Sequence, residues 1–175
     1  MVAVAPPPAH SQQDMFRASM RRLAGAVSVV TVGRGADRTG FTATSVTSLS
    51  VDPPAILVCL DRGSSSWPVL RRHKSFCVNL LAADQAAIAD RFAGRGDVKG
   101  PERYAGAQWH DLATGTPALV DALCAIDCEL EEAIERHSHA ILIGRVRSIT
   151  LRGEAQPLLY FHGAYRHLAD LEPQP

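Results

Sequence analysis

The sequence predicts a mainly β protein in which one sheet closes into a barrel and a few helices flank it. Segments that favour strands, because they are rich in β-branched residues or alternate apolar with polar residues, outnumber the helical segments. The helical segments do not alternate regularly with the strands, which disfavours a doubly wound parallel sheet. Many short strands on a chain of 175 residues are most simply accommodated in a closed barrel.

Length, composition and charge describe one ordinary globular domain. Apolar residues make up 46% of the chain and charged residues 21%, which are usual values for such a domain. Lys and Arg together number 18, as do Asp and Glu, so the formal net charge is zero. A chain without excess positive charge or a basic cluster has little attraction for nucleic acid or an anionic membrane surface. We therefore expect neither partner.

The N-terminus predicts a short leader. Residues 1–13 contain three consecutive prolines and no basic cluster followed by an apolar run, so we expect a disordered or polyproline-like segment rather than a signal peptide. Residues 14–170 are expected to form the folded domain. No apolar stretch approaches the roughly 18 residues of a membrane-spanning helix. These observations predict a cytoplasmic protein.

The first half of the chain predicts three helices and four strands. The first helix runs from Asp14, a plausible N-cap, to Ala24, and Gly25 ends it. A second helix has Pro68 in its first turn and extends to Lys74. The remaining elements are strands over residues 27–32, 41–50, 55–60 and 76–81 and a helix over residues 84–92. The strand over residues 55–60 is entirely apolar and is therefore expected to be buried on both faces.

The second half of the chain predicts long strands after a loop-rich segment, residues 94–115. From Cys124 onward apolar and acidic residues alternate, which is the period of a half-buried strand. Cys124, Ile126, Cys128 and Leu130 are expected to face the core, and Asp127, Glu129 and Glu131 the solvent. Further strands are predicted over residues 139–151, 158–161 and 164–168, the last two paired around Gly163.

The motifs of the usual nucleotide and hydrolase sites are incomplete. Gly33 and Gly35 follow a strand, as in a dinucleotide-binding loop, but Arg38 stands where a third glycine is required. A strand rich in Thr and Ser follows, rather than a helix whose N-terminus could bind phosphate. The serines at 64–66 lack the flanking glycines of a nucleophile elbow. We interpret Gly33 and Gly35 as turn residues.

Cysteines and histidines predict no metal site. Four cysteines occur in apolar or alternating stretches: Cys59, Cys77, Cys124 and Cys128. They form no C-x-x-C pair, so we interpret them as buried free thiols. His137 and His139 would share one face of a strand, but no carboxylate or third histidine stands at ligand spacing.

One segment, residues 40–54, has a more specific pattern. Its sequence is GFTATSVTSLSVDPP, and related segments follow in order at residues 56–60, 76–85, 91–93, 143–146 and 157–165. Together these segments resemble the short-chain flavin reductases, the NAD(P)H:flavin oxidoreductase components of two-component flavin monooxygenases. The resemblance covers roughly residues 14–168.

The resemblance implies an FMN-binding split β-barrel that works as a homodimer. It implies that NADH or NADPH reduces FAD or FMN, and that the reduced flavin passes to a partner monooxygenase or hydroxylase. Two alternatives remain open: a flavin-binding protein that stores flavin without turnover, and a flavin-dependent oxidase of a small organic substrate. Oxidation of NADH in proportion to added flavin would distinguish the reductase from the storage protein.

The flavin-binding residues that the resemblance implies lie in five segments. Backbone amides and hydroxyls on a strand suit the polar edge of an isoalloxazine, and serines before a helix suit a phosphate. The candidates are Ala43, Thr44, Ser45, Val46, Leu60, Ser64, Ser65, Ser66, Asn79, Leu80, Leu81 and Phe92. The alternative is that the first group is an ordinary Thr-rich strand and the serines are a plain helix cap.

The nicotinamide side is less completely matched. The family typically carries Gly-Asp-His before its penultimate long strand, whereas this chain has His137-Ser138-His139, so only His139 is retained. His139, Tyr165 and Arg166 are the candidates for contact with the nucleotide; Tyr165 could equally belong to the core. No catalytic side chain is expected, because hydride passes directly between the two cofactors when their rings are stacked.

Overall fold

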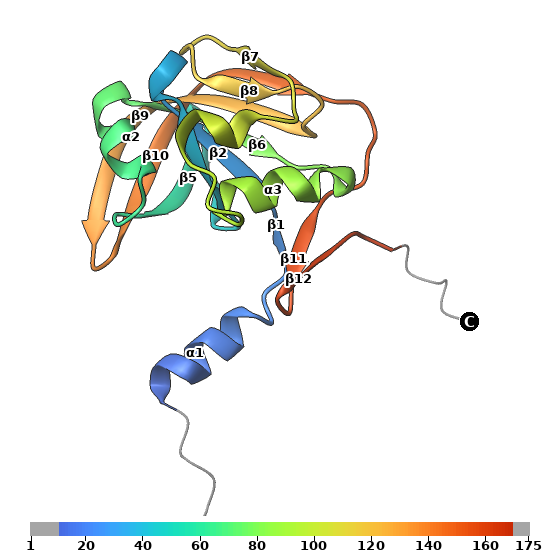
Figure 1. Ribbon diagram of the computed structural model, residues 1–175. Coiled ribbons are helices and arrows are strands. Elements are labelled where there is room, and N and C mark those ends of the chain that lie inside the picture. The colour runs from blue at the N-terminus through green and yellow to red at the C-terminus, as the bar shows by residue number, and fades with distance from the viewer. Residues whose placement is uncertain (1–10, 170–175) are drawn as a thin grey trace, which may run out of the picture.

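The computed structural model of the protein describes residues 11–169 and consists mainly of antiparallel strands (Figure 1). The helices are α1 (Gln12–Met20), α2 (Ser66–His73) and α3 (Ala86–Phe92), with short 3-10 turns η1 (Gly35–Asp37), η2 (Ala83–Gln85) and η3 (Gly100–Tyr104). The strands are β1 (Gly25–Ala26), β2 (Ser28–Val32), β3 (Thr39–Ala43), β4 (Val46–Val51), β5 (Pro54–Asp61), β6 (Ser75–Leu80), β7 (Trp109–Asp111), β8 (Pro117–Leu119), β9 (Cys124–Arg136), β10 (His139–Leu151), β11 (Leu159–Phe161) and β12 (Ala164–Arg166). The leader predicted for residues 1–13 lies outside the described range except for its last three residues.

Seven strands form one antiparallel sheet in the order β3-β2-β6-β9-β10-β5-β4. Strands β9 and β10 pair from one end to the other and make a long ribbon in its middle. Two small sheets, β1-β11-β12 and β7-β8, flank the large one. The predicted mainly β architecture is confirmed, and each helix or strand that was predicted begins within two residues of its predicted start, whereas β1, β7 and β8 were not predicted.

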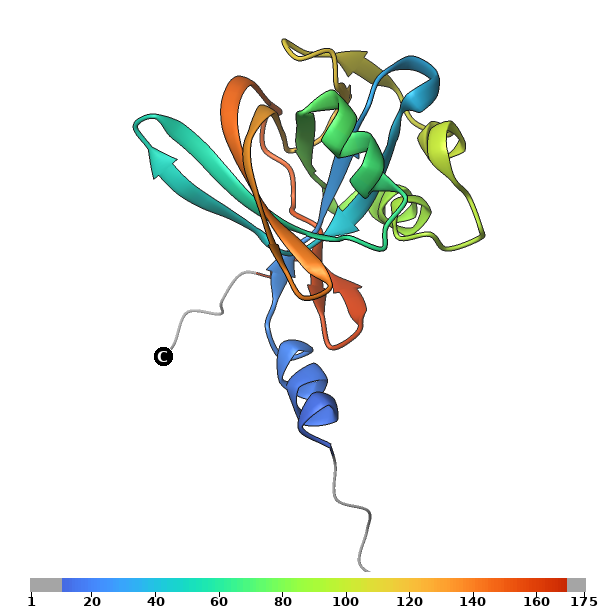
Figure 2. The same ribbon diagram turned by 90° about the vertical axis from the view of Figure 1, so that its left-hand side faces the viewer.

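The two outer strands of the large sheet, β3 and β4, are consecutive in the chain. Only Thr44 and Ser45 separate Ala43, the last residue of β3, from Val46, the first residue of β4. Three peptide units span at most about 11 Å, so the two edges must meet here although five strands lie between them in the sheet. The backbone N–H of Cys59 donates to the Ser45 carbonyl (3.4 Å), which ties this corner to β5. The sheet therefore curls into a barrel, which Figure 2 shows turned by 90° from the view of Figure 1.

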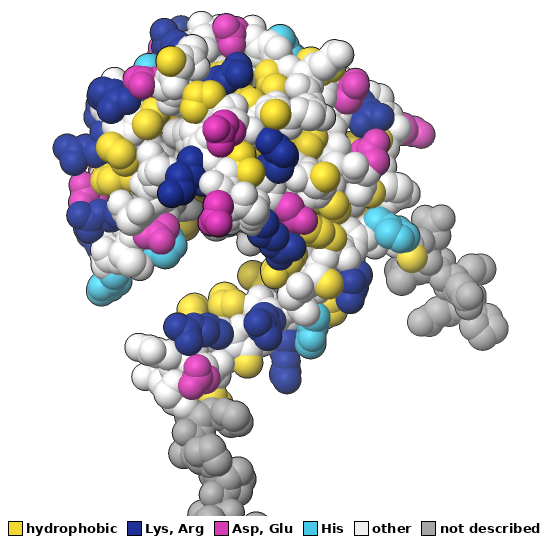
Figure 3. Space-filling view, viewed as in Figure 1, with side chains coloured by type: hydrophobic (Ala, Val, Ile, Leu, Met, Phe, Trp, Pro, Cys, Tyr) yellow, Lys and Arg dark blue, Asp and Glu magenta, His cyan; other side chains and the backbone are white. Residues whose placement is uncertain are grey.

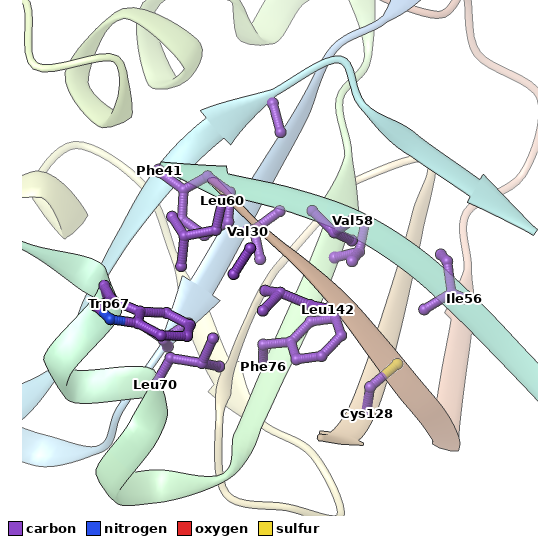
Figure 4. Packing of buried hydrophobic residues seen from close by; sticks show 14 residues of the cluster. Val30, Phe41, Ile56, Val58, Leu60, Trp67, Leu70, Phe76, Cys128 and Leu142 are labelled. Carbon is purple, nitrogen blue, oxygen red and sulfur yellow. The ribbon is translucent and has the colours of Figure 1, made fainter. Parts of the chain in front are cut away.

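The main hydrophobic core fills the inside of the barrel (Figure 4). Val30 of β2, Phe76 of β6 and Leu142 of β10 are fully buried in it. Helix α2 contributes Trp67 and Leu70 from one end. Burying a side chain of this size stabilises the fold by roughly 1.5–3 kcal/mol, so this cluster accounts for the closed form of the sheet.

A second core lies between α3 and the segment that follows it. The rings of Phe92, Tyr104 and Trp109 pack with centroids 4.7–5.6 Å apart. The Tyr104 hydroxyl donates to the Thr39 carbonyl (2.6 Å), and Trp109 Nε1 donates to the Tyr104 carbonyl (3.0 Å). Residues 94–115, which the sequence left without assigned elements, are ordered against the barrel by these contacts.

The first helix begins and ends earlier than predicted. Ser11, rather than Asp14, caps it, because the Ser11 hydroxyl accepts a hydrogen bond from the Asp14 backbone N–H (3.2 Å). The helix ends at Met20 instead of Ala24, and Gly25 belongs to β1. No residue of α1 is buried, and the helix lies away from the barrel (Figures 1 and 2). Within residues 11–169, no helix has both the length and the apolar character needed to cross a bilayer.

The strand predicted over residues 41–50 is in fact two strands on opposite edges of the sheet. The corner at Thr44 and Ser45 had no local signal, because Thr and Ser suit both strands equally well. The strand predicted to be buried on both faces also differs. Ile56, Val58 and Leu60 point into the barrel, whereas the residues between them are only partly covered.

Asp127 was predicted to face solvent, but it is fully buried. The loop before β8 covers this face of β9, and Thr114 donates from its backbone N–H and its hydroxyl to the two carboxylate oxygens of Asp127 (2.7 and 2.6 Å). Burial raises the pKa of Asp127 above its ordinary value, although these hydrogen bonds act in the opposite direction. The alternating pattern therefore predicted strand β9 correctly, but the prediction that the face carrying Asp127 is open to solvent was wrong.

All four cysteines are free thiols, as predicted. Cys77 and Cys128 are buried, but Cys59 and Cys124 are only partly covered, so the prediction of full burial is wrong for these two. Burial raises the pKa of Cys128 to about 12, which keeps this thiol protonated and unreactive at neutral pH.

Candidate active site

A pocket of about 530 Å³ opens at the corner where β3 and β4 meet. Its volume lies within the range of small-molecule sites, roughly 300–1,000 Å³. Segments far apart in the chain supply its walls. The lining residues are Phe41, Thr42, Ala43, Thr44, Ser45, Cys59, Leu60, Asp61, Ser64, Phe92, Ala93, Arg103 and His139.

The buried side of this corner pocket is apolar. Phe41, Ala43, Leu60 and Phe92 are each no more than 9% exposed. Phe41 and Leu60 belong to the main core and Phe92 to the second core, so both cores fix the floor of the pocket. The exposed rim carries polar side chains: Thr44, Ser45, Asp61 and His139. The pocket therefore suits a flat apolar ligand with a polar edge.

Helix α3 is held close to β3, which brings Phe92 into the floor. The Thr42 hydroxyl donates to the Ala89 carbonyl (2.6 Å). A Cβ at Gly40 would lie 2.5 Å from the Val30 carbonyl oxygen and 2.8 Å from the Phe92 ring. Only glycine permits this approach of helix and strand.

Arg103 places a fixed positive charge in the wall of the corner pocket. Its guanidinium donates to the carbonyls of Gly40, Phe92 (3.2 Å) and Val98 (3.1 Å). Desolvation lowers the pKa of Arg103, but an arginine remains charged at neutral pH. These contacts tie the loop after α3 to β3 and keep the charge beside the pocket.

His139, the first residue of β10, also lines the rim of the pocket. It pairs with Asp61, the last residue of β5. The Ser138 hydroxyl lies 2.9 Å from Nδ1 of His139, so Nε2 remains for a ligand. Backbone pairing and a neighbouring hydroxyl thus determine where this ring lies.

Seven of the fifteen residues predicted from the sequence line the corner pocket: Ala43, Thr44, Ser45, Leu60, Ser64, Phe92 and His139. They come from β3, the corner, β5, the loop before α2, α3 and β10. The structure therefore brings candidates from six separate segments to one place. Their contacts with flavin or nucleotide stay predictions.

Asn79, Leu80 and Leu81 do not line this pocket, and their predicted contact with a flavin stays a prediction. Asn79 is fully buried, its amide donates to the Val29 carbonyl (3.0 Å), and its oxygen accepts from the Leu119 backbone N–H (2.7 Å). Leu80 packs against the main core and Leu81 lies in the second core. The physical reason is that β6 lies inside the sheet, between β2 and β9.

Of the three serines at the start of α2, only Ser64 lines the pocket. Its hydroxyl accepts a hydrogen bond from the Ser66 backbone N–H two residues along the chain (3.2 Å). Ser65 is exposed outside the lining, and Ser66 is fully buried. Val46 faces a different hollow, the groove beside α1. Ser65, Ser66 and Val46 therefore do not line the corner pocket, and their contact with a flavin stays a prediction.

Tyr165 lines a neighbouring pocket of about 210 Å³, which shares residues 42–44 with the corner pocket. Its hydroxyl donates to Asp90 (2.7 Å), and burial together with this bond raises the pKa of Tyr165 to about 12. Arg166 lines neither pocket, and its Nη1 donates to the Tyr165 carbonyl (2.8 Å). The structure thus places Tyr165 and His139 in adjoining pockets and leaves Arg166 outside both.

Sequence reasoning missed six lining residues: Phe41, Thr42, Cys59, Asp61, Ala93 and Arg103. Four of them stand inside segments already matched to the family, at 40–54, 56–60 and 91–93, so their neighbours could have indicated them. Asp61 follows directly after such a segment. Arg103 lies in the stretch without predicted elements and had no signal.

The residues present fit a flavin. A floor built from two packed cores can stack against one face of a three-ring system, and the rim offers hydroxyls and an imidazole to its polar edge. The positive charge of Arg103 favours a ligand that carries negative charge. Hydride transfer to such a ring requires orientation rather than a protein nucleophile.

Comparisons with known proteins agree with this pocket. The sequence model of the family described as flavin reductase like domain matches residues 20–169. The FMN reductase (NADH) RutF of Cronobacter turicensis is 38% identical over 159 residues, covering 91% of this chain and 95% of that protein.

Two solved structures share the fold. BorF, the flavin reductase component of a bacterial two-component tryptophan halogenase, superposes with a TM-score of 0.83 at 34% identity, covering 91% of this chain and all of BorF. The NADH:FAD oxidoreductase SgcE6 of Streptomyces globisporus, solved with NAD and FAD fragments, gives 0.82 at 27% identity, covering 90% and 93%.

The predicted split barrel and the predicted enzyme class, a flavin reductase that uses a nicotinamide nucleotide, are confirmed by these comparisons. The match extends over most of the chain and over nearly the whole length of its relatives. The chain belongs to the flavin reductase like domain family.

Proposed function

We propose that the protein reduces FMN with NADH in the corner pocket and supplies the reduced flavin to a flavin-dependent oxygenase. The choice of FMN and NADH is supported by the RutF relative, and the oxygenase partner by the role of BorF as a reductase component. The single observation that carries the proposal is the pocket at Thr44 and Ser45, where two cores provide a flat floor beneath a polar rim.

The residues of this chain act by binding and orientation. When both cofactors are bound, the nicotinamide supplies a hydride to the flavin ring. Phe41, Leu60 and Phe92 exclude water from the covered face of the pocket, and Thr44 and Ser45 bind the polar edge of the ring. Holding two rings face to face converts a reaction between free partners into one within a complex, which lowers the barrier.

The nicotinamide lies toward His139. The Nε2 atom of His139 is available to the nucleotide because the Ser138 hydroxyl contacts the other ring nitrogen, Nδ1. Tyr165 remains a candidate for the rest of the nucleotide, since its pocket joins the corner pocket along residues 42–44. Arg166 has no place in this assignment.

The working unit is a homodimer in which a second copy covers α1. Phe16 lies in this helix and is 63% exposed, and Leu23 lies just after it and is 68% exposed. Such a row of large apolar side chains is unusual on a free surface. Hydrophobic side chains gather on the side of α1 that faces the hollow beneath the barrel (Figure 3). This groove, of about 1,030 Å³, also includes Thr44 and Ser45, so a second copy seated there would adjoin the flavin pocket.

The protein works in the cytoplasm in this proposal. Its hydride donor belongs to the central metabolism of the cell, and its four free thiols suit a reducing compartment.

A steady-state assay of NADH oxidation tests the proposed activity. The purified protein is incubated with NADH or NADPH and with increasing FMN or FAD, and the loss of absorbance at the nicotinamide band is followed. We expect oxidation that rises with flavin concentration and saturates at lower FMN than FAD, and that is faster with NADH.

Two outcomes would contradict the proposal. A protein that binds flavin but oxidises neither nucleotide would be a flavin-binding protein without reductase activity. Activity that does not depend on added flavin and accompanies a tightly bound flavin would instead indicate an oxidoreductase acting on another substrate.

A further inference from the structure

The turn that carries His139 is built on an unfavourable backbone conformation. His137 and Ser138 connect β9 to β10, and His137 has φ of 50°. This left-handed region favours glycine, because the Cβ of other residues approaches the following carbonyl. A turn of this kind keeps one shape only when surrounding contacts hold it.

Arg62, the residue directly after strand β5, supplies such contacts. Its backbone N–H donates to the Ser138 carbonyl (2.9 Å) and its Nη1 to the His137 carbonyl (3.0 Å). Its Nη2 lies 2.6 Å from a carboxylate oxygen of Glu135 on β9. One side chain thus binds both the turn and the strand that leads into it.

These contacts continue the sheet beyond its last paired residues. The ladder between β5 and β10 ends where Asp61 pairs with His139, and Arg62 is the next residue after β5. Asp61 and Ser64, on either side of Arg62, line the corner pocket together with His139. Arg62 itself does not line it, so its guanidinium points to the turn rather than to a ligand.

We propose that Arg62 is a positioning residue, which fixes the turn between β9 and β10 so that His139 stays at the rim of the flavin pocket. This inference rests on the proposed function, because it assigns His139 to the nucleotide. A displaced turn would move the imidazole away from its contact, whereas the floor of the pocket at Phe41, Leu60 and Phe92 would keep its shape.

Arg62→Ala and Arg62→Lys test the role, and Arg145→Ala is the matched control. Arg145 makes a similar ion pair with Glu131 on the same ribbon (2.5 Å), but neither residue lines the pocket. The measurements are KM for NADH, kcat, and the dissociation constant of FMN from fluorescence quenching. His139→Ala and the double variant Arg62→Ala/His139→Ala complete a double-mutant cycle.

We expect Arg62→Ala to raise KM for NADH roughly five- to tenfold while kcat changes less and FMN affinity stays near wild type. Lysine can replace one of the two guanidinium contacts, so Arg62→Lys should restore part of the loss. The double variant should have the same KM as His139→Ala alone, because a positioning residue has nothing left to position. Arg145→Ala should behave as wild type.

Two results would overturn the inference while leaving the proposed function intact. In the first, the wild type oxidises NADH, and Arg62→Ala has the same KM for NADH as the control Arg145→Ala. In the second, the effects of Arg62→Ala and His139→Ala multiply, which would mean that Arg62 acts independently of the histidine. A wild-type protein without NADH oxidation would instead refute the proposed function itself.

Discussion

At the scale of single residues, the corner pocket combines polar groups that are used inside the protein with polar groups that remain for a ligand. Thr42 and Arg103 donate to backbone carbonyls and hold α3 and its following loop in place. His139, by contrast, lies on the rim of the corner pocket. Its Nδ1 contacts the Ser138 hydroxyl, and its Nε2 remains for a ligand. This division decides which substitutions should change binding and which should change folding.

His139→Ala should weaken nucleotide binding without changing flavin binding. The imidazole stands on the rim, so its removal leaves the apolar floor unchanged. We expect KM for NADH to rise roughly tenfold, the loss of about one hydrogen bond to a ligand, with an unchanged dissociation constant for FMN. Steady-state kinetics and fluorescence titration measure the two quantities.

His110→Ala is the control for this substitution, since His110 is exposed on β7 and lies outside both pockets. An unchanged KM in His139→Ala would remove this histidine from the nucleotide site.

Asp127 gives the protein a stability that depends on pH. Burial raises the pKa of this carboxyl in the folded protein above its unfolded value of 3.8. The folded state therefore binds the proton more tightly, and stability falls as pH rises from the unfolded pKa through the folded pKa. Relative to Asp127→Asn, which cannot ionise, the wild type should lose free energy of unfolding across this window and become constant above it.

Urea denaturation of both proteins at several pH values measures this difference. A difference that is independent of pH would contradict this prediction by showing that the hydrogen bonds from Thr114 cancel the cost of burial. A difference that grows in favour of the wild type as pH rises would show that these hydrogen bonds outweigh it.

The residue scale is also where sequence reasoning was least complete. The segment at 40–54 indicated Ala43, Thr44 and Ser45, because a matched segment locates every residue within it. The sequence did not reveal that both polar atoms of the Asn79 amide are bonded to backbone. Arg103 had no signal, because its place depends on contacts with β3 and α3 that are remote in sequence.

At the scale of elements, the β9–β10 ribbon lies directly against the core strand β6. Gly144 of β10 makes this possible: an added Cβ would collide with the Phe76 ring and lie 2.9 Å from the Cβ of Cys128. Both of these neighbours are fully buried, so they have no free space into which to move.

Gly144→Ala should therefore destabilise the fold by about 1–3 kcal/mol, the usual cost of overpacking a core. The free energy of unfolding in urea measures the effect. Gly153→Ala is the control, because a Cβ there would meet no atom within 4 Å. A wild-type stability of Gly144→Ala would mean that β6 and β10 can separate more easily than their packing indicates.

Helices and strands were predicted well where the period of apolar residues in the sequence matches the face that is buried. Strand β10 begins and ends at its predicted residues, His139 and Leu151. The division of residues 41–50 into β3 and β4 was missed, because the reversal at Thr44 and Ser45 serves barrel closure rather than local preference. The covering of Asp127 by the loop before β8 was missed for the same kind of reason.

At the scale of the whole molecule, the position of α1 is the feature that a single chain does not explain. Isolated helices of this length are marginal in water unless an apolar face is packed, and α1 has no buried residue. A second copy that covers it would provide this packing. We therefore propose the exposed surface of α1 as the interface of the homodimer that the family resemblance implies.

The double substitution Phe16→Asp and Leu23→Asp should convert the dimer to a monomer. Two carboxylates in a buried apolar contact carry a large desolvation penalty, so the mass from light scattering should fall to that of one chain, 18.8 kDa. The control is Gln12→Asp with Gln13→Asp, which adds the same charge to α1 without removing an apolar side chain. A dimer that survives the first double substitution would place the interface elsewhere.

A crystal structure of the protein with FMN tests the account most directly. We predict density for the three-ring system in the corner pocket, against the floor of Phe41, Leu60 and Phe92, with its polar edge at Thr44 and Ser45. A flavin bound at another place on the protein, with this pocket left open or closed by its own side chains, would contradict the account.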